Sequence, residues 1–278
     1  MSPEPSRGVN ARITFLGTGT SAGVPMIGCT CAVCRSTDPR DRRWRPSIYL
    51  EVPEVPGVPG VRGAGILVDT SPDLRQQALT FGLTRIDAVL FTHSHADHIL
   101  GLDEIRRFNA VQGAAIPCYA APQAWESIRR TFYYVFDGVP RQGGGIPKVE
   151  PHEIDGRPFV VSGLRVVPVP LWHGPTPILG FRFGSVAYLT DCSAIPDDSW
   201  PLVAGVETLV IDALRDRKHA THFTVAEALD AISRIAPRRA YLTHMAHDLG
   251  HAETSARLPE AVELAYDGLV LDVTVDAS

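Results

Sequence analysis

Four potential metal ligands stand within six residues of the stretch Phe91-Thr-His93-Ser-His95-Ala-Asp97-His98-Ile-Leu-Gly101. The apolar run before them, residues 87–92, is expected to form a buried strand, so that the ligands fall on the turn that leaves it. His93 and His95 are two residues apart, and an extended backbone points both side chains the same way. Asp97 and His98 follow where the chain curls, which lets a second ion lie beside the first. We interpret the motif as a site for zinc or a related divalent ion rather than as a polar loop, because such a density of imidazoles and an acid is hard to explain otherwise.

The size and composition are those of an ordinary globular protein. The chain has 278 residues, 45% of them hydrophobic, and a mean hydropathy of +0.02. We expect a single α/β domain over residues 1–278. No secretory signal and no apolar run of about 18 residues is visible, so no membrane span is expected. A net charge of −5 argues against nucleic-acid binding driven by bulk charge, and five cysteines, three of them clustered, favour a reducing cytoplasm.

Short strands alternate with helices along the sequence. We expect strands at residues 12–16, 47–52, 65–69, 87–92, 116–120, 149–153, 164–170, 178–183, 186–190, 208–211, 239–243, 262–265 and 269–275. Helices are expected at 72–81, 101–111, 123–133 and 225–235, the first capped by Ser71 and the last by Thr224. Asp267-Gly268 is a hairpin signal between the last two strands. Because several strand pairs have short connections, the pattern favours two mixed sheets that face each other, with helices outside.

Single polar residues follow three of the later strands. His173 comes after residues 164–171, Asp191 after 186–190 and His244 after 239–243. Taken alone, such a histidine is more often a surface or core residue, and such an aspartate usually caps a turn. Their recurrence beside the dense histidine motif indicates an active site assembled from strand ends.

This pattern resembles the metallo-β-lactamase superfamily, and the resemblance covers nearly the whole chain. It implies a four-layer αββα sandwich with one or two metal ions at its edge. The implied ligands of the first ion are His93, His95 and His173; those of the second are Asp97, His98 and His244, with Asp191 bridging. A bridging aspartate, where the antibiotic-degrading branch has cysteine, indicates a hydrolase with two zinc or manganese ions that share a hydroxide.

A further motif, Cys29-x-Cys31-x-x-Cys34, predicts a structural zinc site within residues 28–35. Thiolates at these spacings can surround a tetrahedral zinc, with a fourth ligand from elsewhere in the chain. His247 is the favoured fourth ligand, because it lies three residues past His244 and one short loop would then serve both centres. His251 is the alternative.

The cysteine motif, an early Gly-Thr-Gly, a Thr-His-x-x-His ending and a terminal Tyr-Asp-Gly resemble the phosphoribosyl cyclic phosphate phosphodiesterases, a subgroup of the superfamily. In that subgroup a histidine before the helix that precedes the last ligand strand takes part in catalysis; His222 matches it and His219 is a weaker candidate. The resemblance also suggests a homodimer. The coenzyme PQQ synthesis protein B shares the cysteine motif, but that branch has an altered histidine motif, whereas all four ligands are present here.

We therefore expect a cytoplasmic, metal-dependent phosphodiesterase that acts on a small, cyclic or simple, phosphodiester. Asp97, Asp191 and His222 are its expected catalytic residues, and neither nucleic acid nor a membrane is an expected partner. Two alternatives stay open: another hydrolase of the fold, acting on a lactone, a thioester or a tRNA 3′ end, and an accessory protein like the PQQ branch.

Two other segments are candidates for substrate binding. The insertion at residues 122–148 is neither long nor strongly basic, which argues against a tRNA-binding arm, and we interpret it as a loop or lid. Five arginines between residues 35 and 45 would suit a phosphate group, but Asp38 and Asp41 lie among them, and a solvated loop is the favoured interpretation. The five are Arg35, Arg40, Arg42, Arg43 and Arg45.

Overall fold

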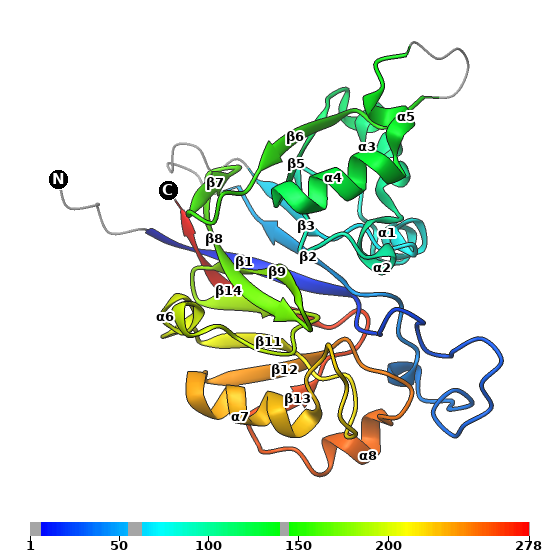
Figure 1. Ribbon diagram of the computed structural model, residues 1–278, viewed down its shortest axis with the longest axis vertical. Helices are drawn as coiled ribbons and strands as arrows, with labels where there is room; N and C mark the ends of the chain where they lie inside the picture. Colours follow the sequence, from blue (N-terminus) through cyan, green and yellow to red (C-terminus); the bar gives the residue numbers. More distant parts are fainter. Residues whose placement is uncertain (1–6, 55–62, 140–144, 278) are drawn as a thin grey trace.

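The protein is a layered α/β sandwich in which helices cover the outer faces of two mixed sheets (Figure 1). The computed structural model describes residues 7–54, 63–139 and 145–277. Two of the expected features, the facing sheets and the αββα order of layers, are confirmed.

The first sheet has the strand order β14-β1-β2-β3-β4-β5-β6. Its strands are β1 (Arg7–Gly17), β2 (Ser47–Val52), β3 (Ala64–Val68), β4 (Ala88–Leu90), β5 (Ile116–Ala120), β6 (Val149–Glu153) and β14 (Val270–Ala277). The strands from β3 to β6 run parallel to one another, and the others pair antiparallel.

The second sheet has the order β8-β9-β10-β11-β12-β13. Its strands are β8 (Leu164–His173), β9 (Thr176–Phe183), β10 (Val186–Leu189), β11 (Thr208–Asp212), β12 (Arg239–Thr243) and β13 (Val262–Leu264). β8 pairs with β9 along most of its length and with β14 through Leu164 and Ala277, so it joins the two sheets. A strand that the sequence did not predict, β7 (Phe159–Val161), pairs with the start of β8.

Three apolar clusters hold the layers together. The central one lies between the sheets and includes Phe15, Phe181 and Tyr188. A second packs the outer face of the second sheet against α6 (Trp200–Val203) and α7 (Val225–Ile235). The third packs the first sheet against the remaining long helices, α1 (Leu74–Phe81), α3 (Ile105–Gln112) and α4 (Pro122–Thr131). Burial of these apolar faces is the main favourable contribution to folding.

Three short α-helices, α2 (Ala96–Ile99), α5 (Tyr133–Phe136) and α8 (His251–Ser255), and three 3₁₀ turns, Pro39–Asp41, Leu102–Glu104 and Asp197–Ser199, complete the helices of the described residues. α4 and α5 occupy the described part of the 122–148 insertion, where Trp125 and Ile128 are buried in the third cluster. Residues 140–144 lie outside the described residues, and a lid there stays a prediction.

Helix α7 forms where it was predicted, for the predicted reason. Thr224 precedes it, and the Thr224 side chain accepts a hydrogen bond from the Glu227 backbone while the Glu227 carboxylate accepts one from the Thr224 backbone. This reciprocal pair is a capping box. The predicted cap at Ser71 is wrong: α1 begins at Leu74, and Ser71 instead accepts a hydrogen bond from the backbone of Asp73 within the turn before the helix.

The predicted terminal hairpin is also wrong. β13 extends the second sheet by pairing in parallel with β12, whereas β14 crosses to the first sheet and pairs with β1. Asp267 lies on that crossing and is half-buried in contact with other segments. Its carboxylate accepts hydrogen bonds from the backbone and hydroxyl of Thr18, at 2.9 and 2.8 Å, and from the backbone of Trp44 at 2.7 Å.

Replacement of Asp267 by alanine should therefore destabilise the fold. The change leaves the donors of Thr18 and Trp44 without their acceptor, and we expect a loss of about 2–3 kcal/mol in the free energy of unfolding, measured by urea denaturation. Asp272→Ala is the matched control, because that side chain is exposed on β14. Equal stabilities of the two variants would contradict this account.

Candidate metal centre

The candidate site lies at one edge of the sandwich, where strands of both sheets end. β3 and β4 are parallel in the first sheet, and β10, β11 and β12 are parallel in the second. Their carboxyl ends carry polar residues in turn: Asp69, His93, Asp191, Asp212 and His244. β8, which also ends at this edge, contributes His173. The topology thus brings together residues that are up to 175 positions apart, from 69 to 244.

The structure brings the predicted ligands together there in two groups. One comprises His93, His95 and His173; the other comprises Asp97, His98, Asp191 and His244, and within each group the ligand atoms lie within 4.8 Å of one another. His95 is exposed to solvent and the other six are buried, so the site opens on the side of His95.

Asp191 lies between the two groups. One of its carboxylate oxygens is 3.3 Å from Nε2 of His98, and the other is 3.1 Å from Nε2 of His244 and 3.9 Å from Nε2 of His93. Asp97 completes the second group, 3.4 and 3.5 Å from the same Nε2 atoms of His98 and His244. The position of Asp191, with one oxygen toward His98 and the other toward His244 and His93, is the one that a bridging carboxylate requires.

The residues present fit a metal centre. Nε2 of His93, of His98 and of His244 are all buried and lack a hydrogen-bond partner within the described chain. Such orphaned buried nitrogens are unfavourable unless another group satisfies them. All three belong to the two groups, and imidazole nitrogen with carboxylate oxygen is a donor set that suits zinc and similar divalent ions.

The backbone is strained at the same place. Five non-glycine residues of the described chain have positive φ, and three of them are site residues: Asp69 at 64°, Asp191 at 58° and His244 at 58°. Each sits directly after a strand, where the left-handed conformation turns its side chain into the site. Strain of this kind persists only where the surrounding structure enforces it, and it is concentrated at functional sites.

Two acids that the sequence analysis did not single out support the histidines. Asp69 is fully buried; it accepts hydrogen bonds from the backbone and hydroxyl of Thr92, both 2.8 Å, and its Oδ2 lies 2.8 Å from Nδ1 of His98. Asp212, also fully buried, lies 3.2 Å from Nδ1 of His222 and 3.7 Å from Nδ1 of His244. The shorter contacts, to His98 and His222, fix the imidazole orientation and leave Nε2 of each ring free.

His222 borders both groups. Its ring is stacked on that of His244 at 4.7 Å between centroids and lies edge-on to that of His173 at 4.6 Å. It is buried, and it forms candidate ligand groups with Asp191 and with Asp212. His219 lies further out, half-buried and 5.2 Å from His222 between ring centroids, so the geometry favours His222 of the two predicted candidates.

The charges of the buried cluster depend on one another. Although burial opposes it, the carboxylates of Asp191, Asp97 and Asp69 raise the pKa of His98 well above its usual value. Despite burial, His244 and His98 hold the pKa of Asp191 well below its usual range. Burial lowers the pKa of His173 to about 4, and burial together with His244 lowers that of His222 to about 3. Protons and neighbouring charges thus compensate the carboxylates here, a part that a divalent cation can take over.

The three clustered cysteines form a separate group with His247. Nδ1 of His247 lies 3.2 Å from Sγ of Cys29 and 3.4 Å from Sγ of Cys31, and Cys34 completes the group. His251, the alternative fourth ligand, is not part of it: its backbone N–H donates to Asp41 and its ring contacts Tyr266. Three sulfurs and one nitrogen suit a structural zinc site. Figure 1 shows this segment (blue) beside α8 (orange).

Of the five arginines between residues 35 and 45, Arg43 has a structural role. It is almost completely buried, and its guanidinium donates to the backbone oxygens of Ala246 at 3.0 Å and Leu249 at 2.6 Å. Ala246 lies between His244 and His247, so Arg43 fixes the segment that serves both candidate centres. Arg40 pairs with Asp38, which agrees with the interpretation of the cluster as a solvated loop.

No helix in residues 7–54, 63–139 and 145–277 is long and apolar enough to cross a membrane.

The two cysteines outside the cluster, Cys118 and Cys192, are fully buried, as expected of core thiols.

The chain belongs to the β-lactamase superfamily, since the family model of the β-lactamase superfamily domain matches residues 65–245. Within it, the chain is PhnP-like: it is 42% identical to a crystal structure described as a new diphosphatase from the PhnP family, with a TM-score of 0.87 over 97% of this chain and 100% of the other. The resemblance inferred from the histidine and cysteine motifs is thereby confirmed, and the protein has the metallo-β-lactamase fold.

Two curated relatives bear other names. An octanoyltransferase of Porphyromonas gingivalis (strain ATCC BAA-308 / W83) is 39% identical over 93% of this chain, but the chain spans only 51% of that protein's length. A coenzyme PQQ synthesis protein B of Methylobacterium nodulans (strain LMG 21967 / CNCM I-2342 / ORS 2060) is 31% identical over 71% of each chain.

The thiols of the cysteine cluster should differ in reactivity when metal is removed. The backbone N–H of Cys34, together with His247, lowers the pKa of Cys31 to about 6, whereas burial raises that of Cys34 to about 11. At pH 7.5, iodoacetamide should therefore modify Cys31 long before Cys34, and the rate at Cys31 should fall as the pH drops below about 6 because the thiolate becomes protonated. Peptide mass spectrometry measures both rates. Added zinc should protect both thiols, and equal rates with and without zinc would contradict a metal site.

Proposed function

We propose that the protein is a metal-dependent phosphoric diester hydrolase that acts on a small, cyclic phosphodiester. The observation that carries the proposal is the convergence of the two ligand groups on Asp191, with bare Nε2 atoms on His93, His98 and His244. Two divalent ions bound there would supply Lewis-acid chemistry, polarising a phosphoryl oxygen and lowering the pKa of a water molecule.

Some of the site residues would hold the ions, and others orient imidazole rings of the site. His93, His95 and His173 would hold one ion, Asp97, His98 and His244 the other, and Asp191 would contact both. Asp69 orients the ring of His98 and Asp212 that of His222, so that these imidazoles need not reorganise when an ion or a substrate binds. Because His95 is the exposed member of the groups, substrate would approach from its side.

His222 is the proposed proton donor to the leaving group. Asp212 lies beside its Nδ1, which leaves Nε2 to act toward the neighbouring groups. Burial and His244 keep the pKa of His222 near 3, so its imidazole is neutral in the free protein at pH 7. An anionic phosphoryl group bound next to it is the charge that favours protonation, since a nearby negative charge stabilises an imidazolium.

A diphosphate is the second candidate substrate, and the likeness to the PhnP-family diphosphatase supports it. The two reactions share attack on phosphorus and differ in the bond that breaks: an ester P–O bond releases an alkoxide, and an anhydride P–O bond releases a phosphate. Phosphate is the better leaving group and needs less protonation. The two substrates should therefore depend on His222 to different extents.

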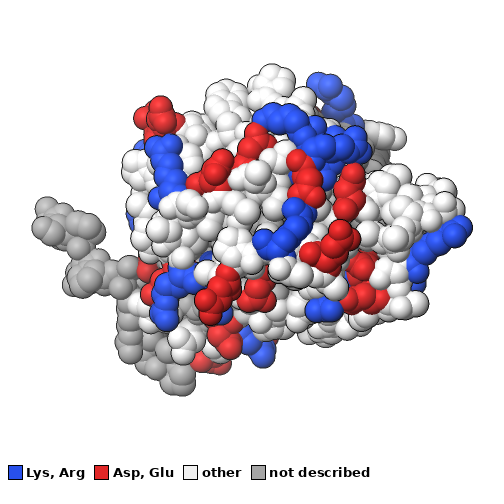
Figure 2. Space-filling model, turned by 90° about the horizontal axis from the view of Figure 1, so that it is seen from below, with Lys and Arg blue, Asp and Glu red and all other residues white. Residues whose placement is uncertain are grey.

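The other named activities have less support. The chain matches about half of the octanoyltransferase, and the name of that protein does not say which half carries out acyl transfer. The ligand set, complete in this chain, favours hydrolysis over an accessory role of the PQQ type. Figure 2 shows acidic and basic side chains interspersed on the face seen from below, which offers no single-sign patch for nucleic acid on that face. A homodimer and a cytoplasmic location stay predictions.

A substrate panel tests the proposal. With zinc or manganese, the protein should hydrolyse bis(p-nitrophenyl) phosphate and a five-membered cyclic phosphate faster than p-nitrophenyl acetate, a thioester or a lactone. Asp191→Ala should abolish this activity, because its carboxylate lies against His98 and His244 of one group and against His93 of the other. Turnover of the carboxylic substrates alone would contradict the proposal, and turnover of a diphosphate in preference to both diesters would favour the second candidate.

His222→Gln should separate proton donation from metal binding. Loss of a general acid lowers kcat by about 10²–10⁴ for an alkyl leaving group. With a p-nitrophenolate leaving group, which needs little protonation, the loss should be much smaller, and the metal content should be unchanged. Steady-state kinetics on both substrates, with elemental analysis of the variant, measures this. Equal losses on both substrates together with loss of metal would make His222 a ligand instead.

A further inference from the structure

A cavity of about 600 Å³ lies between the 22–25 loop, the 39–45 segment and the end of α1, and we call it the Trp44 pocket. None of its lining residues belongs to the two ligand groups of the candidate metal centre or to the cysteine cluster. Its volume is within the range of small-molecule sites.

Two aromatic rings form one wall of the Trp44 pocket. Trp44 and Phe81 meet edge-on, with 5.8 Å between ring centroids and an interplanar angle of 72°. The backbone of Trp44 is held in place by its 2.7 Å hydrogen bond to Asp267. Trp44 is half-buried, and its indole N–H has no partner among the residues that the structure describes. The wall thus offers a fixed aromatic surface with one available donor.

The acidic side chains of the pocket have partners within the protein, whereas the side chains of Arg42 and Arg45 are largely without them. The guanidinium of Arg42 is exposed and makes no ion pair or hydrogen bond within the described ranges. Arg45 contacts Asp73 through Nε at 3.3 Å, so its terminal nitrogens stay available. Both acids of the lining are occupied: Asp73 accepts from Arg45, and Asp267 accepts three hydrogen bonds from Thr18 and Trp44. The groups left to meet a ligand are therefore cations and donors.

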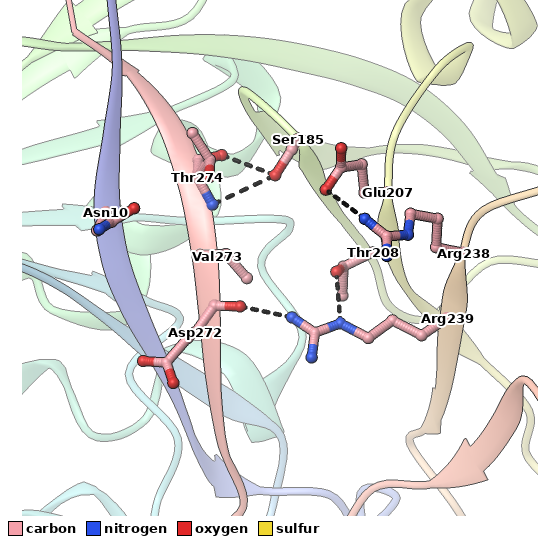
Figure 3. A pocket seen from close by; sticks show the side chains of 9 residues that line it. All are labelled: Asn10, Ser185, Glu207, Thr208, Arg238, Arg239, Asp272, Val273 and Thr274. Atoms are coloured by element: carbon pink, nitrogen blue, oxygen red, sulfur yellow. Dashed lines mark hydrogen bonds and ion pairs between the residues drawn. The ribbon is translucent and has the colours of Figure 1, made fainter.

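Another surface pocket, of about 510 Å³, shows the opposite situation (Figure 3). There Arg239 donates to Thr208 at 2.9 Å and to the backbone of Asp272, and Arg238 lies 4.0 Å from Glu207. It has no aromatic lining residue. Arg239 is thus held by two hydrogen bonds, and without an aromatic wall this pocket does not combine a ring surface with a free guanidinium as the Trp44 pocket does.

We propose that the Trp44 pocket binds a phosphorylated compound with a planar ring, of the kind represented by a nucleoside monophosphate. The ring would pack against Trp44, and the phosphate would meet the guanidinium groups of Arg42 and Arg45. Guanidinium forks match phosphate oxygens, and base–aromatic packing does not require a particular base. This site is separate from the proposed metal centre and does not depend on its chemistry.

The test uses three probes on the whole protein at 0.15 M salt: AMP, ribose 5-phosphate, which lacks the ring, and adenosine, which lacks the phosphate. Binding is followed by the indole N–H resonances in a ¹⁵N-correlated NMR spectrum, with that of Trp44 assigned by its absence in Trp44→Phe. AMP should shift the Trp44 resonance saturably, at lower concentration than either fragment, and leave that of buried Trp125 unchanged.

Arg42→Ala should weaken AMP binding by about tenfold or more, the expected effect of losing a charge-assisted hydrogen bond. Arg35→Ala is the matched control, since it removes one exposed arginine of the same segment that does not line the pocket. The proposal is overturned if AMP leaves the Trp44 resonance unmoved, if ribose 5-phosphate binds as tightly as AMP, or if Arg35→Ala and Arg42→Ala weaken binding equally. AMP binding that resists Arg42→Ala but disappears in Asp191→Ala would place the ligand at the metal centre and would likewise overturn it.

Discussion

Carboxylates and imidazoles buried in mutual contact at one edge of the sandwich are the constraint on which the rest of the structure depends. Asp69, Asp97, Asp191 and Asp212 are all removed from water there, and burying an ionised carboxylate is costly unless a cation or several donors compensate it. The protein supplies part of that compensation through imidazoles and backbone N–H groups. The strained φ values of Asp69, Asp191 and His244 show that the fold holds these groups together rather than letting them separate.

The two candidate centres are parts of one construction. His244 and His247 lie on the same short segment after β12, and buried Arg43 holds the carbonyl of Ala246 between them. The backbone of Met245 also pairs with the Gly17–Thr20 turn, which connects β1 to the cysteine segment. A zinc ion among the cysteines would therefore stabilise the segment that positions His244, which is a physical reason for a structural metal beside the proposed catalytic centre.

Much of this was predictable because the dense histidine motif and the polar residues after apolar runs are local signals. His173, Asp191 and His244 were found in this way. Asp69 and Asp212 carry the same signal, but an aspartate after a strand usually caps a turn, and only the three-dimensional contacts with His98 and His222 reveal their function. The terminal hairpin was mispredicted because a turn sequence specifies a reversal of the chain and not the sheet that each strand joins. Here β14 pairs with β1 in the first sheet, and Asp267 accepts hydrogen bonds from Thr18 and Trp44 on the way.

The most direct test of the central claim is zinc-edge anomalous diffraction from crystals grown with zinc. The account predicts two peaks about 3.5–4 Å apart flanking Asp191, one beside His93, His95 and His173 and the other beside Asp97, His98 and His244, with a third peak among Cys29, Cys31, Cys34 and His247. A peak at the cysteines alone, with none among the histidines, would contradict it.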